Sequence, residues 1–422
     1  MNSAGANVQR RVAGHRTAMV VMTTIFFMWG FITVLNDVLI PHLKALFTLD
    51  YTRVMLVQFT FFGAYFLMSL PAGKVLARFG YRFSIVAGLI VTGIGALLFL
   101  PAARVPSYPL FLFAFFVLAS GITLLQVAAN PYVTLLGPAR LASSRLNLAQ
   151  ALNSLGTMLA PAFGGLLILS TAVLGATALA RRSPAAQTAY RLQQAHSVEG
   201  PYIGIAIVLC VLAVVVWLAR LPSVSAHTAV DAAQPRFADA LRLPRVWFAM
   251  LAIFVYVGAE VSIGSFMINY LSLPEIGNMP EARAAFFVSL YWGGAMVGRF
   301  IGSAVLTRIP TRRLLAFNAS IAALLVIATM LTHGHVAVAA VVAVGLFNSV
   351  MFPSIFALGI EDCGPLTGKV SSLLIMAIVG GAIVPLAQGA LADHIGVHHA
   401  YVLPLACYLY IIFYGARGSR IA

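Results

Sequence analysis

Residues 16–44 read RTAMVVMTTIFFMWGFITVLNDVLIPHLK, and this stretch sets the fold class of the whole chain. It holds about the 20 mostly apolar residues that one bilayer-spanning helix needs. Near its end stand Asn36 and Asp37, an amide and a carboxylate with no basic residue beside them in the sequence. A carboxylate within a membrane helix costs about 2.5 kcal/mol or more, so such residues usually face a cavity and mark an ion or substrate path. The alternative is that Asp37 is simply hydrated at the outer membrane interface.

The composition of the rest of the chain agrees with a membrane protein. Of its 422 residues 61% are hydrophobic and only 9% are charged, and the mean hydropathy is +0.97. Soluble domains carry about 25% charged residues. A membrane β-barrel would show alternating segments of about ten residues, whereas this chain repeats apolar runs of about 20. The sequence therefore predicts an all-α, multi-pass membrane protein.

We expect twelve transmembrane spans. They cover about 17–41, 54–77, 83–101, 108–136, 146–173, 200–220, 246–272, 284–307, 313–332, 335–359, 370–392 and 399–416. The longest polar interruption, 221–245, separates spans six and seven and is typical of a linker with a short amphipathic helix at 236–243.

The basic residues orient these spans. Lys and Arg accumulate in the cytoplasmic loops of membrane proteins. With the N-terminus inside, cytoplasmic segments hold 18 of the 26 basic residues and external segments hold 7, while Arg299 falls within span eight. Both termini are therefore predicted to be cytoplasmic. The same distribution of basic residues between the spans explains the net charge of +15. The charge therefore need not indicate nucleic-acid binding, for which we would expect a basic groove with interleaved aromatic residues.

An internal repeat divides the chain into two halves. Asp37 lies 223 positions before Glu260, and Gln126-x4-Pro131 lies 222 positions before Asn348-x4-Pro353. Two further pairs keep a similar offset: Asn153-Ser-Leu-Gly156 with Ile378-Val-Gly380 at about 224, and the loops 78–82 and 308–313 at about 230. Parallel six-helix halves joined by a cytoplasmic linker form the major facilitator architecture, which binds substrate near the midplane. The predicted parts are a cytoplasmic N-terminal tail 1–16, halves 17–220 and 246–416, a cytoplasmic linker 221–245 and a C-terminal tail 417–422.

Only two of the eleven acidic residues, Asp37 and Glu260, fall within apolar runs, at equivalent places in the two halves. Such a carboxylate can load and release a proton as a cavity opens to either side of the membrane. It could equally help to ligate sodium, and the spacing does not choose between the two cations. For Glu260 the alternative is a structural pairing with Arg299 or with a backbone group.

Amides and aromatic residues gather in the same spans. Amides donate and accept hydrogen bonds, which suits a hydroxyl-covered ligand, and aromatic faces suit the C–H face of a sugar ring. The alternative is that amides bond between helices and that aromatics face lipid. Within this set, which includes Asn147, Asn318 and Gln388, the candidate substrate ligands are Trp29, Asn36, Gln126, Asn130, Gln150, Asn153, Asn269, Trp292 and Asn348.

Enzymatic functions fit the sequence poorly. All nine histidines lie in or near loops or termini, so the span interiors offer no histidine-based metal site or catalytic triad. The three cysteines have neither disulfide nor metal spacing. No phosphate-binding loop is present, because Gly73-Lys74 is followed by Val75. We expect no cofactor, and a transmembrane proton or sodium gradient as the driving force.

Several motifs resemble one family over nearly the whole chain. They are Phe26-Phe27-Met28-Trp29, Leu35-Asn36-Asp37, Ala128-Ala129-Asn130-Pro131-Tyr132-Val133, Arg145-Leu146-Asn147-Leu148-Ala149-Gln150, Gly258-Ala259-Glu260 and Pro353-Ser354-Ile355-Phe356. The chain resembles the fucose permease branch of the major facilitator superfamily, the fucose–galactose–glucose symporters. This resemblance implies sugar import coupled to a cation, usually a proton, with Asp37 on the family's coupling acid. It also places Gln150 and Asn153 on positions linked to the sugar and the cavity, and Trp29 at a cavity position.

One departure from the family pattern concerns the substrate. The fucose permease has a second acid in span four, just before the Ala-Ala-Asn-Pro stretch, whereas this chain has Gln126 there. A neutral amide cannot titrate and instead resembles a sugar ligand. Because the fucose permease has an acid at this place, the change favours D-glucose or D-galactose over L-fucose as the substrate. We therefore expect a monomeric hexose:cation symporter of the cytoplasmic (inner) membrane, with the proton favoured. Sodium coupling, facilitated diffusion without coupling, and a sugar-binding receptor without flux are the alternatives.

Overall fold

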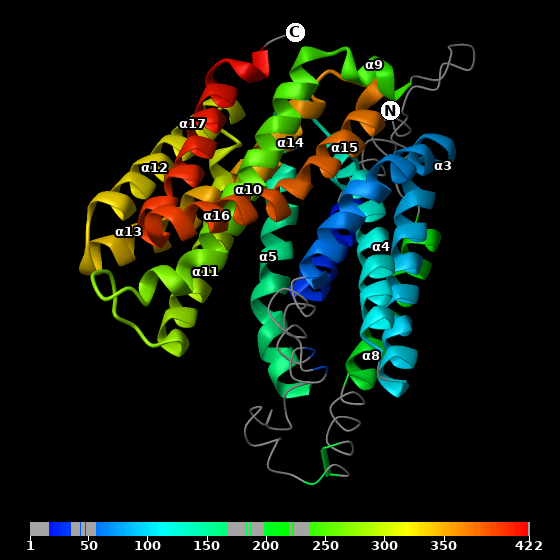
Figure 1. Cartoon of the computed structure of the whole chain (residues 1–422). Helices are drawn as coiled ribbons and strands as arrows, with labels where there is room; N and C mark the ends of the chain where they lie inside the picture. Colours follow the sequence, from blue (N-terminus) through cyan, green and yellow to red (C-terminus); the bar gives the residue numbers. More distant parts are fainter. Residues whose placement is uncertain are drawn as a thin grey trace. The chain divides into compact units, whose positions relative to one another are not determined.

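The computed structural model describes residues 17–34, 43, 47, 56–105, 107–167, 183, 186–187, 198–219, 222 and 236–420. Over these residues the chain is built from helices and their connections, and no β-strand is found among them (Figure 1). Nine of the described helical stretches are long and apolar enough to cross a membrane. The predicted all-α membrane fold is therefore confirmed, while the count of twelve spans and the cytoplasmic termini stay predictions.

The chain divides into two compact units. Unit 1 draws its residues from 1–129 and 155–222, and unit 2 draws its residues from 130–154 and 223–422. These units have other bounds than the six-helix halves expected at 17–220 and 246–416, which stay predictions.

Unit 1 is built around the helix Thr17–Val34, α3 (Leu56–Arg104), α8 (Glu199–Leu218), most of α4 (Tyr108–Leu135) and the end of α5 (Ala142–Leu167). α3 contains both spans expected at 54–77 and 83–101, and it bends at Gly80, whose φ of 76° only glycine adopts readily. α3 packs along α8, where the rings of Phe99 and Tyr202 stack with centroids 4.2 Å apart. The first span is described as far as Val34, so its predicted end at 35–41 lies outside the described residues.

Unit 2 holds the remaining elements. They are η1 (Ala139–Leu141), α9 (Phe237–Leu241), α10 (Pro244–Leu271), α11 (Glu281–Val305), α12 (Thr311–Leu331), α13 (Gly334–Asn348), α14 (Met351–Ile360), η2 (Gly364–Leu366), α15 (Thr367–Met376), η3 (Ala377–Val379), α16 (Gly380–Ala400), α17 (Val402–Ala416) and η4 (Gly418–Arg420). α10 packs against α11, α14, α16 and α17, while α12 packs against α13 and α17 (Figure 1). α9 confirms the short helix expected at 236–243.

The tenth predicted span, 335–359, is interrupted between α13 and α14. The cause lies in Pro353, which has no N–H and cannot donate to the carbonyl of Ser349 one turn earlier. In a membrane each freed backbone group needs another partner. The Arg299 Nε donates to the Ser349 carbonyl at 3.2 Å, and the Tyr256 hydroxyl donates to the Asn348 carbonyl at 3.0 Å. The break therefore gathers polar side chains within unit 2.

Each unit contains one equivalent close crossing of two helices. In unit 1 a side chain at Gly156 would collide with the carbonyl oxygen of Phe27, and in unit 2 one at Gly380 would collide with that of Phe254. The two glycines are 224 positions apart and the two phenylalanines 227. Small residues let membrane helices approach this closely. The offset seen in the sequence therefore recurs as the same contact in both units.

Candidate functional site

A buried ion pair lies at the centre of unit 2. The Glu260 carboxylate on α10 lies 3.5 Å from the Arg299 guanidinium on α11, and these side chains are only 12% and 11% exposed. The Tyr256 hydroxyl, one turn before Glu260, shares its single proton between the same carboxylate oxygen at 2.8 Å and the Asn348 carbonyl at 3.0 Å. A buried charge is tolerated when it is both paired and hydrogen-bonded. The structure thus contains the pairing that the sequence offered as the structural alternative for Glu260.

Arg299 extends this network to α5. Its guanidinium donates to the hydroxyl of Ser154, and that hydroxyl donates to the Gln150 carbonyl at 3.0 Å. Arg299 also binds the Ser349 carbonyl at the break between α13 and α14. One side chain therefore joins α10, α11, this break and the part of α5 that belongs to unit 2, residues 142–154.

Asn348 forms the second part of the unit 2 network. Its Nδ2 donates to the Tyr291 hydroxyl at 2.7 Å, and its Oδ1 accepts from the Tyr408 hydroxyl at 2.6 Å. The Tyr291 hydroxyl donates in turn to the Glu260 backbone carbonyl at 3.3 Å. Asn348 and both tyrosines are almost fully buried. Because each face of the amide has a partner, its orientation is fixed.

Unit 1 contains a matching pair. The Nε2 of Gln126 on α4 donates to the Tyr65 hydroxyl on α3 at 2.6 Å, and Trp29 is a second hydrogen-bonding partner of that hydroxyl. All three side chains are buried. Gln126 precedes Asn348 by 222 positions and Tyr65 precedes Tyr291 by 226. The internal repeat therefore places the same amide–tyrosine hydrogen bond in both units.

The other amides from the sequence analysis have varied surroundings. Asn130 is fully buried, and among the described residues its side-chain nitrogen and oxygen have no hydrogen-bond partner. Gln150 is buried and Asn153 half-buried on α5. A buried amide without a hydrogen bond costs about 1–3 kcal/mol of stability. The Asn130 side chain can therefore gain a hydrogen bond from a ligand or a water molecule.

The remaining candidates lie nearer the surface or outside the described residues. Asn269 is exposed, two residues before the end of α10. Trp292 is 40% exposed, and its ring meets Tyr291 edge to face at 5.2 Å. Asn36 and Asp37 lie outside the described residues.

Two members of the unit 2 network were missed from the sequence, namely Tyr408 and Ser154. Tyr408 sits in an apolar final span, where tyrosine is common as a lipid-facing residue, and Ser154 was noted only within the repeated stretch Asn153-Ser-Leu-Gly156. A lone arginine within a span is the stronger signal, because it needs acceptors.

The described residues contain no group of three or more His, Cys, Asp or Glu side chains that could hold a metal ion. Apart from the Glu260–Arg299 ion pair, the buried polar groups described above are neutral hydroxyls and amides that donate and accept hydrogen bonds, beside aromatic rings. Such groups bind and orient a polar, uncharged ligand.

These features define a class of protein: a multi-pass helical membrane protein, built as a repeat, with buried polar networks inside apolar helices. A model of one family matches residues 18–385, and that family is the Major Facilitator Superfamily. The chain belongs to this superfamily, whose members are transporters and not enzymes.

Individual relatives align over nearly the whole chain. It is 51% identical over 408 residues to a protein of Brucella abortus named "Glucose/galactose transporter", covering 96% of this chain and 94% of the relative. It is 36% identical over 407 residues to the L-fucose-proton symporter of Escherichia coli, covering 95% and 93%. The crystal structure of the Escherichia coli fucose:proton symporter FucP superposes with a TM-score of 0.89 at 33% identity, covering 96% of this chain and 99% of that one. The expected fold and family are therefore confirmed.

Proposed function

We propose that this protein is a secondary active sugar transporter that imports a hexose together with a cation by alternating access. D-glucose and D-galactose are the favoured substrates, with L-fucose as the alternative, and the proton is the favoured cation. The identity of 51% over 96% of the chain with a protein named "Glucose/galactose transporter" carries this proposal. The relative named as an L-fucose-proton symporter supports proton coupling at lower identity.

The environment of Gln126 supports a neutral sugar as the substrate. Its amide is buried and donates to the Tyr65 hydroxyl at 2.6 Å. Because the amide carbonyl is an acceptor that this bond leaves unused, a sugar hydroxyl can donate to it. We assign sugar binding to Trp29, Asn36, Gln126, Asn130, Gln150, Asn153, Asn269, Trp292 and Asn348.

We assign cation coupling to Asp37 first and to Glu260 second. The Glu260 carboxylate has Arg299 and Tyr256 as partners, which balance its charge within unit 2. Asp37 has no basic residue beside it in the sequence. Protonation of Glu260 would therefore break an ion pair with Arg299, whereas protonation of Asp37 would leave no basic sequence neighbour without its partner.

The protein is proposed to act as a monomer in the bilayer of the cytoplasmic (inner) membrane. The test is uptake of labelled D-glucose, D-galactose and L-fucose by proteoliposomes holding the purified full chain. An imposed proton gradient is expected to drive accumulation of D-glucose or D-galactose above the external concentration, with no requirement for sodium. If accumulation needs sodium, the coupled cation is sodium and not the proton. If the sugar equilibrates without accumulating, the protein is a uniporter. If the sugar binds but does not cross the membrane, the protein is a receptor.

A further inference from the structure

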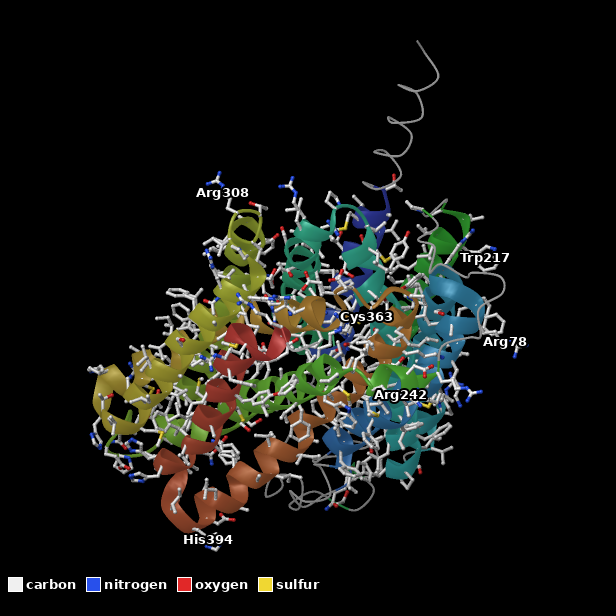
Figure 2. All side chains as sticks on the ribbon, turned by 90° about the horizontal axis from the view of Figure 1, so that it is seen from above. Arg78, Trp217, Arg242, Arg308, Cys363 and His394 are labelled. Carbon is white, nitrogen blue, oxygen red and sulfur yellow. The ribbon has the colours of Figure 1, made fainter. Side chains whose placement is uncertain are left out.

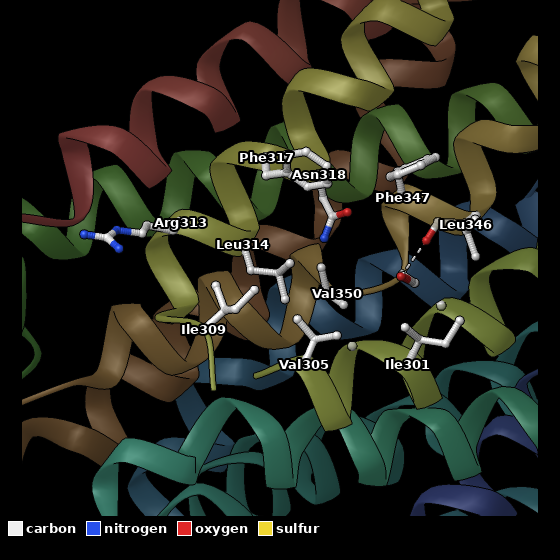
Figure 3. A pocket seen from close by; sticks show the side chains of 13 residues that line it. Ile301, Val305, Ile309, Arg313, Leu314, Phe317, Asn318, Leu346, Phe347 and Val350 are labelled. Carbon is white, nitrogen blue, oxygen red and sulfur yellow. Dashed lines mark hydrogen bonds between the residues drawn. The ribbon is translucent and has the colours of Figure 1, made fainter. Parts of the chain in front are cut away.

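A groove opens between α11, α12 and α13 on the side of unit 2. Its volume is about 510 Å³, and its apolar wall includes Ile301, Val305, Ile309, Leu314, Phe317 and Leu346 (Figure 3). Ile301 and Phe317 are more than half exposed. Because both are apolar and stand on helices of a membrane-spanning unit, we expect the medium that meets these side chains to be lipid.

One polar side chain inside this groove, that of Asn318, has no hydrogen-bond partner among the described residues. Asn318 is only 8% exposed, and its carboxamide points into the groove toward Val350 (Figure 3). Among the described residues it makes no hydrogen bond. An acyl chain alone would leave this amide unsatisfied, at a cost of about 1–3 kcal/mol. The groove therefore suits an occupant that carries a hydrogen-bonding group at this depth.

The end of the groove where α12 begins is positively charged. Arg313 lines this end and is exposed, and Arg308 extends outward from the connection that precedes α12 (Figure 2). Neither arginine has an acidic partner among the described residues, whereas the neighbouring Arg312 is paired with Glu361 at 3.2 Å. The first-turn N–H groups of α12 add partial positive charge. This end therefore attracts an anion.

The spacing of the two polar features matches the parts of a phospholipid. Asn318 follows Arg313 by five residues, which is about 7.5 Å along a helix. In a diacyl phospholipid the ester carbonyls lie one glycerol unit below the phosphate, and the chains continue from there. Along α12 the arginines come first and Asn318 follows, and the apolar wall accompanies both, with Ile309 and Leu314 beside the arginines and Phe317 beside the amide.

We propose that this groove is a binding site for one anionic diacyl phospholipid of the surrounding membrane. The phosphate binds Arg308 and Arg313, an ester carbonyl accepts a hydrogen bond from the Asn318 amide, and one acyl chain lies along Ile301, Phe317 and Leu346. By the predicted topology this is the cytoplasmic leaflet. The proposal is independent of the transported substrate.

The first test measures binding of dioleoyl phosphatidylglycerol to the purified full chain by native mass spectrometry. Arg313→Ala removes a charge-assisted hydrogen bond and is expected to weaken binding about tenfold. Arg417→Ala is the matched control, because Arg417 is also exposed on the predicted cytoplasmic side but does not line the groove. Equal losses in both variants would show diffuse surface attraction only and would overturn the proposal.

The second test addresses the depth of the site. The wild-type protein is expected to bind ester-linked phosphatidylglycerol several-fold more tightly than its dialkyl ether analogue, which has no carbonyl for Asn318. Asn318→Leu should abolish this preference. Leu346→Trp should fill the groove and weaken binding of both lipids, whereas Leu324→Trp, on an exposed part of α12 outside the groove, should not. A wild-type protein without ester preference, or one unaffected by Leu346→Trp, would overturn the assignment.

Discussion

Glu260 and Arg299 form an ion pair with 3.5 Å between Oε1 and Nη2. Both side chains are about nine-tenths buried. Arg299 also donates a hydrogen bond to the Ser349 carbonyl, to which Pro353 cannot donate because it has no N–H. The pair therefore has two tasks in unit 2: it neutralises a buried charge on α10, and it completes the backbone hydrogen bonding at the break between α13 and α14. Either task alone would make Arg299 difficult to replace.

The first prediction concerns this pair. Glu260→Gln keeps an acceptor for Tyr256 but leaves the Arg299 charge uncompensated, so we expect a destabilisation of about 3 kcal/mol. Adding Arg299→Gln should cost less than the sum of the two single changes, because the charges disappear together. Unfolding of the detergent-solubilised variants in a double-mutant cycle measures this coupling.

A second ion pair supplies the control. Arg312 and Glu361 are 3.2 Å apart, but their side chains are 34% and 50% exposed, so their coupling should be about 1 kcal/mol or less. Similar couplings for both pairs, or additive effects at Glu260 and Arg299, would contradict the structural task assigned to the buried pair.

The second prediction concerns Gln126 and Tyr65. Gln126→Ala should weaken sugar binding by about 1–3 kcal/mol, because a sugar hydroxyl would lose its partner in a buried site. Tyr65→Phe removes the hydroxyl that holds the amide and should weaken binding by part of that amount, with little further loss in the double variant. Equilibrium binding of labelled D-glucose measures each effect. Tyr202→Phe, buried against Phe99 in the same unit, should leave sugar affinity unchanged, and unchanged affinity in Gln126→Ala would remove this amide from the site.

The sequence was sufficient for the helices but not for their contacts. Apolar runs of helical length predicted membrane-spanning helices, whereas the bend at Gly80 and the interruption before Pro353 are seen in the structure. Which side chains meet depends on how each helix is rotated about its axis, and a nearly uniformly apolar helix carries little pattern to fix that rotation. For this reason the sequence analysis placed Asn269 and Asn348 together among the candidate substrate ligands and left Asn318 among the other amides of the spans. In the structure Asn269 is exposed, Asn318 lines the groove between α11, α12 and α13, and Asn348 lies in the buried network of unit 2.

The third prediction separates the two candidate coupling acids. Asp37→Asn removes the carboxylate that we assign to cation coupling, so gradient-driven accumulation should be abolished while sugar counterflow persists. Glu260→Gln should retain accumulation at reduced amounts of folded protein, since its charge is already balanced by Arg299. Uptake and counterflow in proteoliposomes, normalised to folded protein, measure both. Wild-type accumulation by Asp37→Asn would refute its role, and a selective loss of accumulation in Glu260→Gln would transfer the role to Glu260.

The fourth prediction tests the equivalent helix crossings of the two units. A methyl group at Gly156 or Gly380 would collide with the backbone carbonyl of Phe27 or Phe254, and backbone cannot move aside as a flexible side chain can. Gly156→Ala and Gly380→Ala should each destabilise the protein by about 1–3 kcal/mol, the usual cost of overpacking. Gly204→Ala on α8 is the matched control, because nothing lies within 4 Å of its added methyl. Alanine there should be neutral or stabilising by up to about 1 kcal/mol, since it favours the helix over glycine. Thermal unfolding of the three variants in one detergent measures these effects. If Gly156→Ala is as stable as Gly204→Ala, the helices at Gly156 have room for a methyl group and the predicted collision with the Phe27 carbonyl is wrong.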